Sequence, residues 1–204
     1  HILRKFLFRY SVDYHIIQLI FFNSLLRSPT PTLTLELERQ SGNLRGWWDR
    51  FTKEPLHKDT ITLYAVTDWI IKPFTAKDAC SFVELVVDEG TVEQAPQWFI
   101  SHWWGEPVRD FVTSVKAHAT VRGVEESTAY WVCAYANNQH ELGTDIAVDP
   151  RQTSFYLAMS QCEGILLILD AGTVPFTRAW CCFEEAMVVR DNKRTRDPLR
   201  LDVA

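Results

Sequence analysis

The chain has 204 residues, of which 47% are hydrophobic, 23% charged and 13% aromatic, and 8 are Trp. This balance is typical of a globular protein, and the length allows one domain with extensions or two small domains. The net charge of -5 argues against binding driven by phosphate neutralisation, so we expect no nucleic-acid partner.

The five cysteines are an odd number without paired spacing. Cys133, Cys162 and Cys181 lie in or beside apolar segments, which favours reduced core thiols over a disulfide framework. Reduced thiols are typical of a reducing compartment, and we therefore expect a cytoplasmic protein.

Residues 1–45 are predicted to form an N-terminal extension and linker. Basic residues precede an apolar run over residues 14–26, and Pro29 and Pro31 follow it. The run is shorter than the roughly 20 residues that span a membrane, so no membrane association is expected. Its proportions also fit a signal peptide, an amphipathic or core-docking helix, or non-native upstream sequence. Because residues 30–46 are polar and turn-rich, residues 1–45 are expected to be dispensable for the fold.

Residues 46–96 are predicted to form a helical segment that packs on a sheet domain. A helix over Thr60–Ile71 is expected to end before Pro73. Thr75 then resembles the N-cap of a second helix over Lys77–Val87. The stretch Ile61–Tyr64 also fits a strand, since short apolar runs do not distinguish the two.

Residues 97–204 alternate between strand and helix patterns. The apolar run from Ile165 to Leu169 has no polar alternation, which is typical of a strand buried on both faces. Leu199–Val203 is predicted to begin a fourth strand. The pattern predicts an α/β fold with a doubly wound parallel sheet in the order 2-1-3. Its strands are expected at residues 98–101, 130–134 and 165–169, and its helices at 107–119, 150–162 and 178–190.

The predicted core combines apolar residues from all three strands with two from the second helix. These residues are expected to be nearly fully buried: Phe99, Trp131, Val132, Phe155, Met159, Leu166 and Ile168.

Polar and aromatic residues follow each predicted strand. The carboxyl ends of parallel strands meet at one edge, where open α/β sheets bind ligands. Aromatic rings there can wall a ring-bearing ligand, while amides and carboxylates orient it. The predicted site comprises His102, Trp103, Trp104, Asn137, Asn138, Asp170, Trp180 and Glu184.

Six of these eight residues also have a structural interpretation. His102 fits a hydrogen-bonded loop histidine, and Trp103 and Trp104 fit packing residues. Asn137 and Asn138 are ordinary turn residues. A Glu near a helix N-terminus stabilises the helix dipole without any further role.

The order of these segments resembles a TIR (Toll/interleukin-1 receptor) domain, closest to the divergent TIR-like proteins of protists and algae. The resemblance covers residues 97–204. It rests on Phe99-Ile100-Ser101-His102, Leu166-Leu167-Ile168-Leu169 and, most specifically, Trp180-Cys181-x-x-Glu184. The resemblance implies a flavodoxin-like doubly wound fold, here C-terminally truncated, with an N-terminal helical extension.

In the enzymatic members of that family, the Glu four residues after this Trp catalyses NAD cleavage, and here that residue is Glu184. The resemblance therefore implies a signalling domain with NAD as a possible substrate, without a cofactor or metal. The chemistry is plausible because a carboxylate offsets the positive charge of an oxocarbenium-like centre. The other hypothesis is a non-catalytic module that self-associates or binds other TIR-like domains. A buried Glu184 with a raised pKa favours the enzyme, whereas a solvent-exposed or ion-paired Glu184 favours the module.

Overall fold

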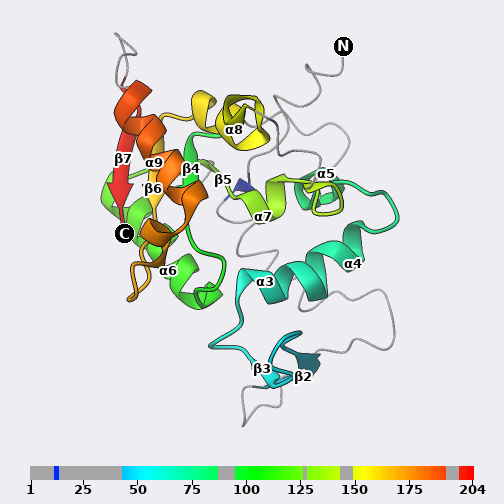
Figure 1. The fold of residues 1–204 in the computed structure, drawn as a ribbon. Coiled ribbons are helices and arrows are strands. Elements are labelled where there is room, and N and C mark those ends of the chain that lie inside the picture. Colours follow the sequence, from blue (N-terminus) through cyan, green and yellow to red (C-terminus); the bar gives the residue numbers. More distant parts are fainter. Residues whose placement is uncertain (1–11, 14–42, 87–94, 126–127, 143–148, 192–197) are drawn as a thin grey trace.

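The computed structural model describes residues 12–13, 43–86, 95–125, 128–142, 149–191 and 198–204. Its centre is a sheet in the order β1-β5-β4-β6-β7 (Figure 1). The strands β5, β4, β6 and β7 are parallel, and β1 is antiparallel to β5. The predicted parallel sheet and its 2-1-3 order are therefore confirmed. The bounds are β1 (Val12–Asp13), β4 (Trp98–Ser101), β5 (Ala129–Trp131), β6 (Gly164–Leu167) and β7 (Arg200–Val203).

Helices cover both faces of this sheet (Figure 1). Helix α6 (Val108–Arg122) packs in one core, and α8 (Ser154–Gln161) and α9 (Ala179–Asp191) pack in the other. Successive side chains of β4 alternate between the two cores, because side chains along a strand point to opposite faces. Ile100 packs with α6, whereas Phe99 packs with α8 and α9. The same alternation continues into the site beyond β4.

The second strand is shorter than predicted. It ends at Trp131, and residues from Cys133 form the helical turn α7 (Cys133–Ala136) instead of the end of a strand. Ala134 and Ala136 are good helix formers, and periodicity over so few residues does not mark the change. The predicted helix at 107–119 extends to Arg122 and ends at Gly123, whose φ of 61° suits a residue without a Cβ.

The predicted core is confirmed at six of its seven positions, since Phe99, Trp131, Val132, Met159, Leu166 and Ile168 are at most 3% exposed. The prediction for Phe155 is wrong, because this side chain is half-buried. Its ring lies between two tryptophans, with centroids 5.4 Å from Trp131 and 5.6 Å from Trp180.

The segment before the sheet contains helix where helix was predicted, with different bounds. Helix α3 (Leu63–Val66) continues through the π-helical turn η1 (Thr67–Ile71) into α4 (Lys72–Thr75). The expected stop before Pro73 is therefore wrong. The backbone N–H of Lys72 donates to Thr67 O, five residues back, and this wider turn accommodates a proline that would disrupt an α-helical turn. The Thr62 hydroxyl caps α3, so Leu63 and Tyr64 are helix and not strand, and Thr62 itself forms an isolated antiparallel bridge with Pro107.

The second predicted helix of this segment begins later than expected. It is α5 (Phe82–Val86), and Thr75 lies in α4 and does not cap it. Ser81 and Glu84 form a capping box, in which the Glu84 N–H donates to Ser81 Oγ and the Ser81 N–H donates to Glu84 Oε2.

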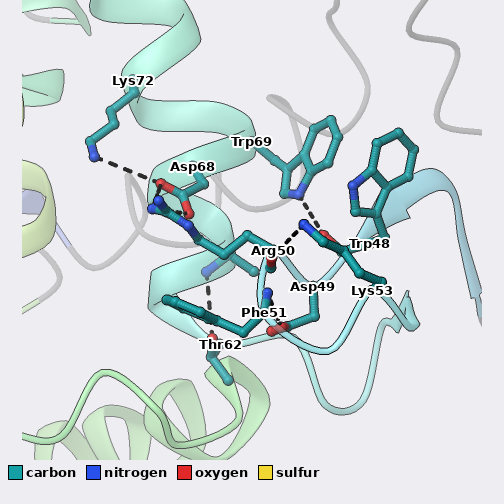
Figure 2. Close-up of polar contacts among 10 residues, drawn as sticks. Trp48, Asp49, Arg50, Phe51, Lys53, Thr62, Asp68, Trp69 and Lys72 are labelled. Atoms are coloured by element: carbon teal, nitrogen blue, oxygen red, sulfur yellow. Dashed lines mark hydrogen bonds and ion pairs between the residues drawn. The ribbon is translucent and has the colours of Figure 1, made fainter.

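A hairpin of β2 (Asn43–Trp48) and β3 (Pro55–His57) opens the segment and packs against η1. Figure 2 shows its anchors: Arg50 binds Asp68 at 3.1 Å, and the Trp69 indole donates to Trp48 O at 3.0 Å. The boundary predicted at residue 45 therefore cuts through a strand. Within the predicted extension, β1 pairs with β5, and most of residues 1–42 lie outside the described residues.

Candidate functional site

Glu184 lies in α9, beside the carboxyl end of β4. Its side chain is buried, with 5% of the residue exposed. Burial raises the pKa of Glu184 to about 8, a contact with the Ser101 hydroxyl lowers it, and the negative charge of Glu185 raises it. The Ser101 hydroxyl oxygen is buried and forms no hydrogen bond with any residue that the structure describes. Among the described residues, no Lys or Arg forms an ion pair with Glu184.

Two cysteine thiols share the environment of Glu184. Burial raises the pKa of Cys133, the first residue of α7, and the charge of Glu184 raises it further. Burial and then the same charge raise the pKa of Cys181 to about 11. Both thiols are therefore neutral at physiological pH, which argues against a nucleophilic cysteine here. Apart from the adjacent Glu185, the polar neighbours named here are thus uncharged groups from β4, α7 and α9.

His102 lies at the same edge, turned toward the opposite face of the sheet. Its ring packs on Phe111 of α6, with centroids 4.6 Å apart. Its Nδ1 lies 3.0 Å from Glu106 Oε1, and both side chains are almost fully buried. The Nε2 atom of His102 is buried without a hydrogen-bond partner in the described structure. The histidine is therefore held by Glu106 and separated from Glu184 by the alternation along β4.

The two tryptophans after β4 serve packing. The indole N–H of Trp104 donates to Cys133 Sγ at 2.9 Å, and its ring lies 5.6 Å from that of Tyr64. Trp103 folds over Gly105, where an added Cβ would clash with the indole. Any side chain at residue 105 would therefore displace Trp103. Trp104 connects the site to α3, and both tryptophans are half-buried.

Three other predicted site residues are occupied by local structure. Asn138 Nδ2 donates to Ala79 O at 2.6 Å, so its amide ties α7 to the loop after α4. The Asp170 carboxylate accepts the backbone N–H groups of Gly172 and Val174, which shapes the turn after β6. Trp180 stacks on Phe155 and is directed toward α8.

Asn137 differs from these, because its side chain is buried at 7% exposure while its Nδ2 has no hydrogen-bond partner in the described structure. Gln139, which was not predicted as a site residue, is buried at 5% and has an unpartnered Oε1. Ser101 and Cys133 were also missed, although each lies where a parallel strand gives way to the next segment. That position is the signal by which sequence could have found them.

The described residues contain no group of three or more His, Cys, Asp or Glu side chains placed to hold a metal ion. All five cysteines are free thiols. In the part of the chain that the structure describes, no helix combines the length and apolar character needed to cross a membrane.

The geometry brings Glu184 together with Ser101, Cys133 and Cys181. Cys133 O also accepts from the buried amide of Gln139 and from the backbone N–H of Asn137. The geometry directs His102, Asn138, Asp170 and Trp180 to other partners. No protein-family model, curated protein or solved structure matches this chain.

Proposed function

We propose that the chain is a TIR-like signalling domain with flavodoxin-like topology that hydrolyses the nicotinamide–ribose bond of NAD through Glu184. One observation carries the proposal: a buried carboxyl group with a pKa of about 8 lies beside the carboxyl end of a parallel strand. The free thiols of the chain fit a reducing compartment, and the proposal places the protein in the cytoplasm.

The electrostatics of Glu184 favour a cationic ligand. A carboxyl group in a low-dielectric site without a neighbouring cation holds its proton, which is the condition of Glu184 here. The nicotinamide ring of NAD carries a positive charge, and the oxocarbenium-like transition state places positive charge on the ribose. Either charge favours the ionised carboxylate, so binding of the substrate is expected to lower the pKa of Glu184 and release its proton.

The hydrolysis balances without a cofactor. The C–N bond between ribose and nicotinamide breaks, and the electron pair stays on the ring nitrogen, which becomes neutral. Water forms the new bond to the ribose carbon and loses one proton to solvent. The Glu184 carboxylate stabilises the positive centre between these events, as carboxylates do in glycoside hydrolysis. Because Glu184 is 5% exposed, its neighbouring side chains must move for a substrate to reach it.

The test compares two adjacent carboxyl groups on one helix. Glu184→Gln preserves the volume and removes the charge, so it is expected to abolish nicotinamide release from NAD. Glu185→Gln serves as the matched control, since Glu185 is half-buried and turned about 100° around the helix axis. It is expected to retain nearly full activity. Equal activity of the two variants, or no activity in the parent protein under assembly-promoting conditions, would contradict the proposal.

A second candidate function, a self-associating interaction module, is favoured by exposed aromatic side chains on the hairpin. Phe51 is 78% exposed and Trp48 is 47% exposed (Figure 2). Exposed large apolar groups are enriched at protein interfaces. Light scattering across a concentration series would test this candidate, with Phe51→Ser expected to weaken association and Thr52→Ser to leave it unchanged. A concentration-independent monomer mass would exclude it.

A further inference from the structure

Two buried amide side chains follow α7 with complementary atoms left unpaired. Asn137 and Gln139 are 7% and 5% exposed. The Nδ2 donor of Asn137 and the Oε1 acceptor of Gln139 have no hydrogen-bond partner among the described residues. Buried polar atoms in native proteins are nearly always paired, so an unpaired donor and acceptor in one short loop need an explanation.

The orientation of the Gln139 amide follows from its neighbours. Its Nε2 donates to Cys133 O at 3.1 Å and to Asn137 O at 3.2 Å. Both partners are carbonyl oxygens, which only accept, so the amide nitrogen must face them. The Oε1 atom is therefore the one left without a partner. The same bonds hold Gln139 rigidly against the loop, with its acceptor preorganised.

Cys133 connects the loop that carries the two amides to the surroundings of Glu184. Cys133 O accepts from Gln139 Nε2, and the backbone N–H of Asn137 also donates to Cys133 O at 3.2 Å. The thiol of the same cysteine lies close enough to Glu184 for that carboxylate to perturb its pKa. Cys133 therefore contacts the Gln139 side chain and the Asn137 backbone through its carbonyl oxygen, and it lies near Glu184 through its thiol.

We infer that Asn137 and Gln139 recognise the primary carboxamide of a cationic nicotinamide group, an inference that rests on the proposed function. The carboxamide oxygen accepts from Asn137 Nδ2, and the carboxamide N–H donates to Gln139 Oε1, which satisfies both orphaned atoms. Glu184 faces the positive charge. A pyridinium carboxylate is rejected, because its oxygen would meet the Gln139 acceptor without a hydrogen between them. The site therefore selects carboxamide-bearing pyridinium compounds over their acid analogues.

The experiment measures the affinity of the purified chain for three cations by calorimetric titration. N1-methylnicotinamide carries charge and carboxamide, N1-methylpyridinium carries charge alone, and N1-methylnicotinate replaces the amide with a carboxylate. We expect N1-methylnicotinamide to bind about 10-fold or more tightly than either other compound, since sites built for hydrogen bonds reject analogues that lack them. Asn137→Asp removes the donor without changing shape and is expected to reduce this preference to about 3-fold or less.

The control variant is Gln97→Glu, which adds the same charge at an exposed amide before β4, at the opposite edge of the sheet. It is expected to keep the full preference. Asn137→Ser provides a second donor-site variant, and thermal unfolding verifies that each variant is folded. Equal binding of N1-methylnicotinamide and N1-methylpyridinium, or an unchanged preference in both Asn137 variants, overturns the inference and leaves the role of Glu184 intact. Failure of N1-methylnicotinamide to bind also overturns it.

The proposed function fails on a different result. If Glu184→Gln binds all three cations as tightly as the parent, the carboxylate does not face the ligand. The preference between the three compounds, measured in the same titrations, still decides the role of the two amides.

Discussion

Replacing Glu184 by Gln is expected to stabilise the protein at neutral and alkaline pH. The pKa of Glu184 is raised from 4.5 to about 8 by burial, so the folded state holds a proton that the unfolded state releases. For an acid whose folded pKa is raised, stability is full below the unfolded pKa. It falls as the pH rises toward the folded pKa. Ionisation of Glu184 therefore opposes folding between about pH 4.5 and pH 8.

The expected magnitude follows from linkage, at about 1.4 kcal/mol for each pH unit between the two pKa values. Between pH 5 and pH 8 the Glu184 contribution lowers the free energy of unfolding by about 3 kcal/mol. Gln has nearly the same shape and does not ionise, so Glu184→Gln removes this pH-dependent loss.

The assay is urea denaturation of the parent and of Glu184→Gln at pH 5 and at pH 8. The quantity of interest is the difference between the two proteins, which cancels the titration of other groups such as His118. That difference is expected to grow by about 3 kcal/mol in favour of the variant from pH 5 to pH 8. Glu185→Gln is expected to show a smaller change, because Glu185 is half-buried. A difference that is the same at both pH values would show that Glu184 titrates normally and refute the reasoning.

Three further predictions concern the fold, each measured by chemical denaturation. Leu166→Ala is expected to cost about 2–5 kcal/mol, because Leu166 is fully buried in the central sheet, and a midpoint near the parent value would contradict a central β6. Asp202→Asn is expected to cost about 1–3 kcal/mol at pH 7, since Asp202 accepts from Arg122 and from His118 Nε2 at 2.9 Å. The pKa of Asp202 is lowered from 3.8, chiefly by the hydrogen bond from Arg122, so the stabilisation by the Asp202 carboxylate is present above pH 3.8 and disappears as the pH falls through the lowered pKa. If Asp202→Asn cost as much at pH 2 as at pH 7, this reasoning would be contradicted. Ser81→Ala is expected to cost about 1 kcal/mol by opening the capping box of α5. The control Thr52→Ala, at an exposed residue outside any helix, is expected to change the free energy of unfolding by no more than about 0.5 kcal/mol, and equal losses in the two variants would argue against the cap.

The site was only partly predictable, because sequence marks where strands end and does not fix which face a side chain takes. Glu184 and Asn137 were predicted and lie around the same cysteine. His102 was predicted beside them, yet it packs on Phe111. Successive side chains along β4 face opposite sides of the sheet, so His102 and Ser101, which lies by Glu184, are on different faces. Asn138 and Asp170 were predicted from the same rule and are held by backbone groups of neighbouring loops. Gln139 could be recognised only from the atom that its hydrogen bonds leave unpaired.

The amino-acid sequence by itself determined the alternation of strands and helices, the parallel sheet and most of the core. Apolar runs such as Ile165–Ile168 exclude water from both faces and so require helices on each side. Only the folded structure shows that the helix continues through Pro73, because no local pattern marks the π-helical turn that accommodates the proline. Tertiary structure also decided the pKa of Glu184, because burial raises that pKa and the residues that bury it include ones about 80 positions away along the chain, such as Ser101. Local sequence specifies which groups are present, and only the folded chain specifies which of them lose their contact with water.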